Sequence, residues 1–438
     1  MKAKKTQIVV VGGGAGGLEL VTRLGKKFGK RDFDIILVER NRTHIWKPLL
    51  HEVAAGSLDA STDEIGYRAH CLRTGYRYFF GSLQGIDREN RQVVIAPLLD
   101  DDGAEIIGEH RIRYDYLVIA IGSVANDFGT QGVSDHCIFL DEPKKAEQFR
   151  YKLLNHCLRV SRLMSSDPQA DEEVHVAIVG GGATGVELSA ELCNAASALR
   201  HYGLEVFDEE RLKVTLLEAG PRILPALPEA LAEAAHLELE DMGVTVIANA
   251  RVKTVTHEAI ITLDGAAHKA DLKVWAAGVK APVFLKDIAG LETDSLNRII
   301  VHPTLQTSRD ERIFALGDCA SCLLPGAENP VPPRAQSAHQ MAQAIFKNLV
   351  ALIEGRPLTD FQYRDRGSLV SLSHFSTVGS LMGNLVGGRM AVEGRLARVA
   401  YISLYRMHQF AIHGWLRGML HIIVSRINRI IRPRMKLH

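Results

Sequence analysis

Residues 7–18 read Gln-Ile-Val-Val-Val-Gly-Gly-Gly-Ala-Gly-Gly-Leu, an apolar run that leads directly into glycines at positions 12, 14 and 17. Residues 174–186 read Val-His-Val-Ala-Ile-Val-Gly-Gly-Gly-Ala-Thr-Gly-Val, which places glycines with the same spacing at 180, 182 and 185. Each copy predicts an apolar strand, a tight turn and a helix. The chain therefore contains two copies of one folding unit.

The glycine spacing indicates a dinucleotide site in each copy. The first glycine allows a tight turn, the second lets the backbone approach a pyrophosphate, and the third lets the helix pack close to the strand. The phosphates would lie at the positive end of the helix. Two glycine-rich turns without a ligand are the plain alternative. Dinucleotide contacts are therefore expected at Gly12, Gly14, Gly17, Gly180, Gly182 and Gly185.

Each copy continues through a helix-like stretch to a second apolar strand that ends in a glutamate, Glu39 or Glu218. A carboxylate at this place accepts hydrogen bonds from ribose hydroxyls. Glu218 would repel a 2′-phosphate, so the second site is expected to favour NADH over NADPH. Arg222 lies nearby in the sequence and leaves that preference open.

Two tandem sites indicate one bound dinucleotide and one that exchanges. Residues 114–122 and 270–278 both read as buried strands that return beneath a nucleotide-binding sheet. Residues 312–320 form an apolar strand that ends at Gly317-Asp318, where a carboxylate suits the ribityl hydroxyls of a flavin. A simple turn is the alternative for Gly317-Asp318. The first unit is therefore expected to hold FAD.

A helix is expected to start within residues 331–346, because prolines precede a run of good helix formers. Gln336, Gln340 and Gln343 fall at i, i+4 and i+7 on one face of it. The N-terminus of this helix would favour negative charge on a reduced flavin. A solvated polar face is the alternative for the glutamines.

With these residues the chain resembles the type II, non-proton-pumping NADH:quinone oxidoreductases of bacterial respiratory chains, over almost its full length. Two further segments carry the resemblance. Residues 46–56 read Trp-Lys-Pro-Leu-Leu-His-Glu-Val-Ala-Ala-Gly, and residues 335–340, Ala-Gln-Ser-Ala-His-Gln, match the family's quinone-site motif. The resemblance implies an α/β fold with two Rossmann-like domains, for FAD and NADH, and a C-terminal membrane-anchoring part.

The family's chemistry is implied in the same way. A hydride passes from NADH to non-covalent FAD, and two electrons then reach a membrane quinone without proton pumping. No metal and no iron–sulfur cluster are implied. Ubiquinone is the expected acceptor, although the sequence itself does not select the quinone, and it leaves homodimer formation open.

The resemblance also assigns roles to single residues. Glu187 corresponds to the family's acidic residue near the flavin, and a catalytic role is expected for it with Gln336 and Gln340. A plain glutamate on a helix face is the alternative for Glu187. Further cofactor contacts are expected from Lys47, Gly122, Gly278, Gly317, Asp318, Ala335 and Gln336.

The cysteines separate the chain from disulfide reductases of the same fold, which carry a redox cysteine pair near the flavin. Residues 46–50 occupy the first-domain position of that pair and contain no cysteine. The close pair Cys319 and Cys322 lies at the expected pyrophosphate turn, and no second CxxC completes a zinc site. A redox or metal role for this pair stays open. The other expectation is that Cys137, Cys157 and Cys193 fill buried space.

Residues 395–438 contain nine Lys and Arg and no Asp or Glu, with apolar and aromatic residues interleaved at a broadly helical spacing. A basic amphipathic helix predicts an anchor that lies on a membrane. No run approaches the ~20 apolar residues that a spanning helix needs. A core-packed basic helix is the alternative, and the density of Trp, Ile and Leu favours lipid over nucleic acid. We therefore expect peripheral attachment to the cytoplasmic side of the inner membrane.

The composition fits this organisation. A chain of 438 residues is expected to form two or three domains, and a net charge of +1 provides no general field for nucleic acid. Six cysteines fit a reducing compartment, and the N-terminus shows no secretory signal. The expected boundaries are 1–130 and 300–360 for the FAD domain, 131–299 for the NADH domain and 361–438 for the anchor.

Three rival functions remain open at this point. A soluble reductase of a protein carrier would not need the basic apolar tail. A sulfide:quinone-type enzyme would need well-placed cysteines. A non-catalytic NADH-sensing flavoprotein would show no turnover with any quinone.

Overall fold

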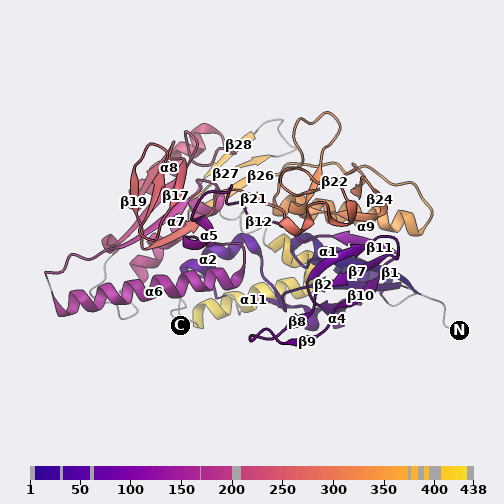
Figure 1. The fold of residues 1–438 in the computed structure, drawn as a ribbon. Helices are drawn as coiled ribbons and strands as arrows, with labels where there is room; N and C mark the ends of the chain where they lie inside the picture. The colour runs from indigo at the N-terminus through magenta and orange to yellow at the C-terminus, as the bar shows by residue number, and fades with distance from the viewer. Residues whose placement is uncertain are drawn as a thin grey trace.

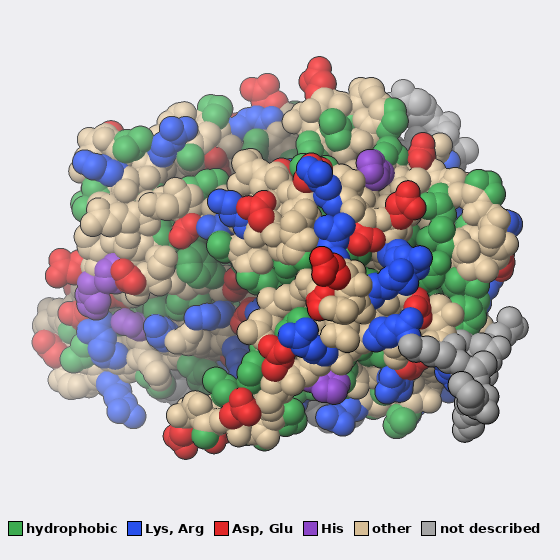
Figure 2. Space-filling view, turned by 45° about the vertical axis from the view of Figure 1, so that its right-hand side comes forward, with side chains coloured by type: hydrophobic (Ala, Val, Ile, Leu, Met, Phe, Trp, Pro, Cys, Tyr) green, Lys and Arg blue, Asp and Glu red, His purple; other side chains and the backbone are tan. Residues whose placement is uncertain are grey.

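The computed structural model describes residues 5–29, 33–59, 64–167, 169–199, 209–372, 376–382, 389–393 and 406–431. Two α/β units lie next to each other (Figure 1). Basic and acidic side chains are interspersed over the face shown in Figure 2, so no strongly positive field covers that face. The sequence prediction of an α/β fold with two Rossmann-like units is confirmed.

The first unit is an eight-stranded sheet around the first glycine-rich segment. Strand β1 (Thr6–Val11) leads into helix α1 (Ala15–Phe28) and pairs in parallel with β2 (Phe33–Glu39) and β11 (Tyr116–Ile119). The strand order is β25-β22-β23-β24-β11-β1-β2-β5. The remaining strands are β5 (Arg77–Phe80), β22 (Ile299–Val301), β23 (Gln306–Thr307), β24 (Asp310–Ala315) and β25 (Ala320–Cys322).

The second unit repeats the central part of this sheet strand for strand. Its order β13-β20-β14-β15-β16 corresponds to β24-β11-β1-β2-β5, and every pairing in it is parallel. Helix α7 (Ala183–Leu199) follows β14 as α1 follows β1. The strands are β13 (Ile138–Phe139), β14 (Val174–Val179), β15 (Leu212–Leu217), β16 (Val244–Ile247) and β20 (Leu272–Trp275). The sequence repeat is therefore a repeat of the fold.

Each unit also carries a three-stranded antiparallel sheet at the same place in its chain order. One interrupts the first unit between β5 and β11, and the other interrupts the second unit between β16 and β20. Their strands are β6 (Leu83–Asp87), β7 (Gln92–Ile95) and β10 (His110–Arg113) in the first, and β17 (Val252–Val255), β18 (Ala259–Thr262) and β19 (Ala267–Lys269) in the second. The two connections between the units pair as β12 (Val124–Ala125) and β21 (Val279–Lys280).

Helices pack on both sheets, and one of them, α2, joins the two units. Helix α9 (Ala335–Ile353) packs along α1 over the first sheet, and α2 (Leu50–Ala55) packs between α6 (Pro143–Ser166) and α7 of the second unit. The first unit thus contributes α2 to the apolar core of the second, through Val53 and Ala54, which are fully buried. Other helices are α4 (Tyr67–Thr74), α5 (Val133–His136) and α8 (Glu229–Asp241).

The C-terminal region contains a sheet that the sequence analysis did not predict. Strands β26 (Gly367–Leu372), β27 (Ser376–Met382) and β28 (Arg389–Glu393) form an antiparallel sheet. Val370 and Leu372 of β26 are buried in the core of the second unit. Only part of the region after residue 361 is therefore free to face a membrane.

The basic tail forms two helical segments, at 406–413 and in α11 (Trp415–Ile431), and Gly414 interrupts them with a φ of +79°. The first segment packs on the protein, because Ile412 belongs to the first unit's core and His408 is buried against His44. Residues 395–405 and 432–438 of the expected amphipathic stretch lie outside the described residues. Across the described part of the chain, no helix combines the length and apolarity needed to cross a membrane.

The third glycine of each fingerprint brings its helix against its strand. A Cβ on Gly17 would lie 1.9 Å from the carbonyl oxygen of Gly12, and one on Gly185 would lie 2.0 Å from that of Gly180. The second glycine, Gly14 or Gly182, faces open space instead, with nothing within 4 Å of such a Cβ. The close contact at the third glycine is needed for the fold. The open space beside the second glycine is available to a ligand.

This difference predicts opposite results for two alanine variants in the second unit. Gly185→Ala should lower the free energy of unfolding by about 3 kcal/mol, because its Cβ meets a backbone carbonyl that cannot move without displacing β14. Gly182→Ala should unfold like the wild type but bind NADH more weakly. Thermal denaturation and NADH titration separate the two effects, and equal destabilisation by both variants would contradict the assignment.

Candidate active site

The two glutamates at the ends of β2 and β15 perform the same task in both units. One carboxylate oxygen of Glu39 accepts from the backbone N–H of Gly13 at 2.6 Å, and Glu218 accepts from Gly181 at 2.6 Å. The other oxygen accepts from Asn41 N at 2.8 Å or from Gly220 N at 2.6 Å. Each carboxylate is therefore held beside the open second glycine and keeps lone pairs for ribose hydroxyls.

Arg222, which the sequence analysis left open as a contact for a 2′-phosphate, binds carbonyl oxygens of its own loop instead. Its guanidinium donates to the carbonyl oxygens of Leu224 at 3.2 Å and Pro225 at 3.3 Å. These bonds hold it in its own loop, whereas Glu218 lies beside the cradle of the second unit. The arrangement favours a ribose hydroxyl over a 2′-phosphate.

Lys47, Ser123 and Asp318 come together from three distant parts of the chain. The Lys47 Nζ donates to the carbonyl oxygen of Ser123 at 2.9 Å, and the Ser123 hydroxyl donates to Asp318 at 2.7 Å. Burial lowers the pKa of Lys47, and the charges of Asp318 and two other carboxylates oppose that shift. The Lys47 side chain is nevertheless in part exposed to solvent, so it can reach a ligand bound beside Asp318.

Three further predicted glycines, in addition to Gly12 and Gly180, occupy backbone conformations that only glycine adopts easily. Gly122, Gly278 and Gly317 have φ values of +80°, +65° and +71°. Gly122 and Gly278 end the corresponding return segments of the two units, and Gly317 turns the chain from β24 towards Asp318. Ala335 begins α9, which packs against the turn at Asp318. The described residues of the first unit thus fit FAD, with an open glycine cradle, a fixed ribose carboxylate and a Lys47–Asp318 wall.

The glutamines of α9 contact the segment that leads into β26. Gln336 donates to the carbonyl oxygen of Gly367 at 3.0 Å and accepts from Arg366 N at 3.1 Å. Gln340 donates to the carbonyl oxygen of Arg364 at 2.9 Å and accepts from the same residue's N–H at 3.0 Å. Their shared helix face, as predicted, therefore binds residues 364–367 of the C-terminal region.

Glu187 is buried at a junction of three elements. Its carboxylate accepts from the backbone N–H of Ser371 on β26 at 3.1 Å and lies 3.5 Å from His51 Nδ1 on α2. Both side chains are almost fully buried, and burial lowers the pKa of His51 to about 4. Glu187 is thus not a solvated residue on a helix face, since it faces a neutral histidine and the strand that the α9 glutamines hold.

Comparison with known proteins decides the family. Residues 6–342 match the model of the pyridine nucleotide-disulphide oxidoreductases. The chain is 48% identical to the type II NADH:quinone oxidoreductase of Haemophilus influenzae, over 98% of this chain and 99% of the relative. It is 28% identical to that of Staphylococcus aureus, over 89% and 93%. The chain belongs to the type II NADH:quinone oxidoreductases.

Solved structures support the fold of this type II enzyme. NDH2 from Plasmodium falciparum, solved in complex with NADH, superposes with a TM-score of 0.81 at 18% identity and covers 99% of this chain and 100% of its own. The sulfide:quinone oxidoreductase of Aquifex aeolicus superposes with a TM-score of 0.70 at 17% identity, covering 97% and 95%. At such identities the likeness is one of fold, and the family comes from the sequence match.

Four of the six cysteines of this type II enzyme are buried thiols. Cys319 and Cys322 are both free and fully buried, and burial raises the pKa of each to about 11. A thiol kept protonated at neutral pH is a poor nucleophile and a poor metal ligand. Cys137 and Cys157 are buried as expected, whereas Cys193 is only partly buried. Among the described residues, no group of three metal-ligating side chains is present.

The sequence analysis missed two partners of its candidate residues. His51 lies inside the quoted segment 46–56, yet nothing in the sequence placed it against Glu187. His339 lies between the two motif glutamines, and its Nδ1 is 2.5 Å from the fully buried Glu19 of α1. Both contacts join elements far apart in sequence, so only their position in a recognised motif could have drawn attention to them.

The paired roles of Glu39 and Glu218 predict the nucleotide preference of this type II enzyme. Glu218→Ser should raise activity with NADPH relative to NADH by about tenfold, because a carboxylate that repels a 2′-phosphate is removed. Steady-state kinetics with both nucleotides give the ratio. Glu39→Ser is the matched control, since it removes the same contact in the first unit and should weaken FAD retention without changing the ratio. Equal use of both nucleotides by the wild type would show that the ribose assignment is wrong.

Proposed function

We propose that this chain oxidises NADH in its second unit, through FAD held in its first unit, and reduces a membrane quinone at the junction with its C-terminal region. The observation that carries this proposal is the duplicated cradle, in which an open second glycine lies beside a fixed glutamate in both units. FAD and NADH are the cofactor and the substrate of this family. When bound, the flavin supplies a ring that accepts a hydride and releases electrons singly or in pairs.

The chain's own residues provide position and electrostatics. Gly14 and Glu39 hold the FAD pyrophosphate and ribose, and Gly182 and Glu218 hold those of NADH. Asp318, fixed by the Ser123 hydroxyl, is placed for the ribityl hydroxyls. Lys47 adds a positive charge at the same wall, which favours a reduced, negatively charged ring.

Quinone reduction is assigned to the junction of α9, residues 364–367 and β26. Gln336 and Gln340 bind residues 364–367. Ser371, on the strand β26 that follows, donates its backbone N–H to Glu187. Quinone reduction consumes two protons, and Glu187 is a buried carboxyl beside a neutral histidine at this junction. We assign Glu187 the delivery of one proton, with Gln336 and Gln340 placing the quinone through the segment they hold.

This assignment predicts a selective defect. Gln336→Ala should slow flavin reoxidation by quinone by about tenfold, the cost of about 1.4 kcal/mol of lost hydrogen bonding, with little effect on flavin reduction by NADH. Stopped-flow absorbance of the flavin separates the two half-reactions. Gln343→Ala is the control on the same helix, because Gln343 bonds to His339 instead of the segment. An equal loss in both half-reactions would contradict the role.

Membrane attachment is assigned to the outer face of α11. Trp415, Leu416 and Leu420 are 70%, 80% and 61% exposed, which is unusual for adjacent large apolar side chains. The β8 (Leu98–Leu99) and β9 (Glu105–Ile107) hairpin, with exposed Ile106 and Ile107, lies on the same lower side of the molecule in Figure 1. A helix of this kind lies in the interface rather than across the bilayer. Attachment to the cytoplasmic side of the inner membrane would bring cytosolic NADH and membrane quinone to one enzyme.

The apolar face provides a cleaner test than removing the tail, because Ile412 and His408 are buried and a truncation would expose the first unit. The triple variant Trp415→Gln, Leu416→Gln, Leu420→Gln should leave the membrane fraction, since each side chain contributes about tenfold to partitioning. Its activity should fall with long-tailed quinones and much less with a short, water-soluble quinone. Leu237→Gln with Leu263→Gln is the control, as both are exposed on the second unit. Recovery of the triple variant in the membrane pellet at the wild-type level would rule out this anchor.

A further inference from the structure

Positively charged and ionisable groups gather where α1, α4 and α11 meet. His70 of α4 lies 6.0 Å from His413 at a steep angle, and His413 stacks on His421 of α11 at 5.2 Å and 14° between ring planes. Arg417 of α11 lies close enough to Lys26 of α1 for its charge to lower the pKa of Lys26. We call His70, His413, His421, Lys26, Arg73 and Arg417 the basic junction.

Like charge and burial act together on the basic junction. The pKa of Lys26 is lowered first by burial and then by Arg23 and Arg417. Burial first, and then the charges of His421, His70, Lys26 and Arg417, lower the pKa of His413 to about 4. His70 reaches about 4 for the same reasons, through burial, Lys26 and Arg73, although the backbone at Ile412 opposes the shift. Every charged group that acts on these residues is basic.

No carboxylate offsets this charge within the described chain. Nearby acids have other partners, because Glu19 pairs with Arg23 and His339, and Glu354 pairs with Lys27 and Arg356. None of the described ion pairs includes Lys26, Arg73 or Arg417. A bound anion would relieve the repulsion and raise the pKa values of Lys26, His70 and His413 towards their usual values.

Helix dipoles explain only part of the basic junction. Lys26 and Arg73 lie in the last turns of α1 and α4, where a basic side chain complements the dipole. Arg417 lies in the first turn of α11, which contains no acid and is the positive end of that helix. The position of Arg417 is therefore unfavourable unless negative charge comes from outside the chain.

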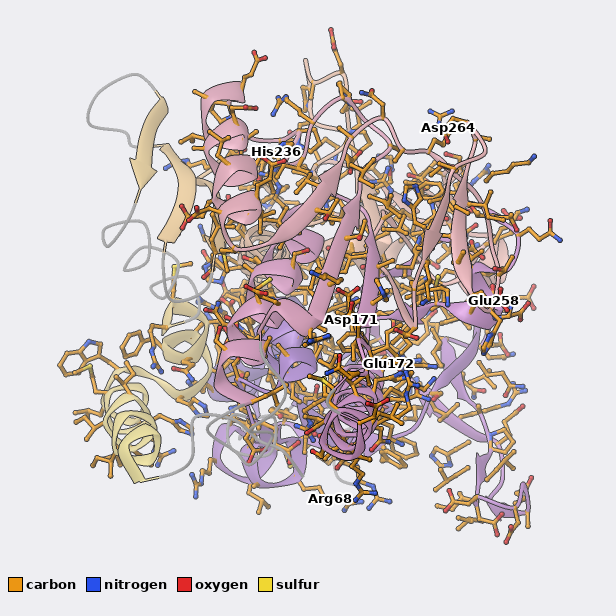
Figure 3. All side chains as sticks on the ribbon, turned by 90° about the vertical axis from the view of Figure 1, so that its left-hand side faces the viewer. Arg68, Asp171, Glu172, His236, Glu258 and Asp264 are labelled. Atoms are coloured by element: carbon orange, nitrogen blue, oxygen red, sulfur yellow. The ribbon has the colours of Figure 1, made fainter. Side chains whose placement is uncertain are left out.

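We propose that the basic junction binds the phosphate of an anionic phospholipid, an inference that rests on the proposed membrane attachment and adds a headgroup site to it. Lipid is favoured over a soluble phosphate because the cations adjoin exposed apolar side chains. Leu72, beside Arg73 on α4, is 87% exposed, and Trp415 and Leu416 directly precede Arg417. In Figure 3 the labelled Arg68, also on α4, lies at the lower edge of the molecule, and the yellow C-terminal helix lies at the lower left. Cations next to apolar side chains match a headgroup next to acyl chains.

Vesicle sedimentation tests the site with the intact holoenzyme. The probes are phosphatidylcholine vesicles with and without phosphatidylglycerol. The wild type should prefer the anionic vesicles, and Lys26→Gln with Arg417→Gln should reduce that preference by about 30-fold, or about fivefold for each charge. Arg251→Gln with Lys253→Gln removes the same charge from exposed residues at β17 and should change it little. FAD content and turnover with a water-soluble quinone should be unchanged in both variants.

The outcomes separate this site from the membrane attachment itself. If the wild type sediments with neither kind of vesicle, the attachment fails. If it binds both kinds equally, or if the two double variants lose the preference equally, attachment stands and the headgroup site is wrong. A second readout is the His413 ring followed by NMR. Short-chain phosphatidylglycerol should raise its pKa, and inorganic phosphate at the same concentration should not; an equal rise with both would identify a general anion site and overturn the lipid assignment.

Discussion

The third glycine of each fingerprint sets the distance between helix and strand, and the site depends on this contact. Because Gly17 and Gly185 carry no side chain, their helices approach the carbonyl oxygens of Gly12 and Gly180 closely. The helix N-terminus then lies over the strand end, with the open second glycine at its edge. A glutamate on the neighbouring strand binds the loop between them, so one packing contact creates both a pyrophosphate cradle and a ribose acceptor.

The repeat extends beyond this contact to the whole strand order and to the inserted antiparallel sheets. The two units differ in what is added to them. The first unit receives α9 and the Lys47–Asp318 wall, which suit a cofactor that stays bound. The second unit receives α2 and β26 against α7, which bury Glu187 next to His51. These additions make the two copies of one fold different, and the proposed function assigns them different roles in one electron-transfer path.

The C-terminal region contacts both units and ends in the exposed helix α11. Its strand β26 binds Glu187, its segment 364–367 is held by the α9 glutamines, and its helix at 406–413 is buried against the first unit. Among the described residues of this region, α11 presents the exposed large apolar side chains. Under the proposed function, this region would complete the quinone junction at one end and place α11 against lipid at the other.

The sequence alone determined the two cradles, because a strand, a turn and a helix are local and their glycines have fixed spacing. It also identified Glu39, Glu218, Asp318 and the basic tail, whose chemistry is visible in a few consecutive residues. Tertiary structure decided the contacts between distant segments, including His51 with Glu187, Gln336 with Gly367 and the sheet at 367–393. Short strands that are buried by long-range packing carry little periodic signal, and a hydrogen bond across the chain leaves no pattern in the sequence.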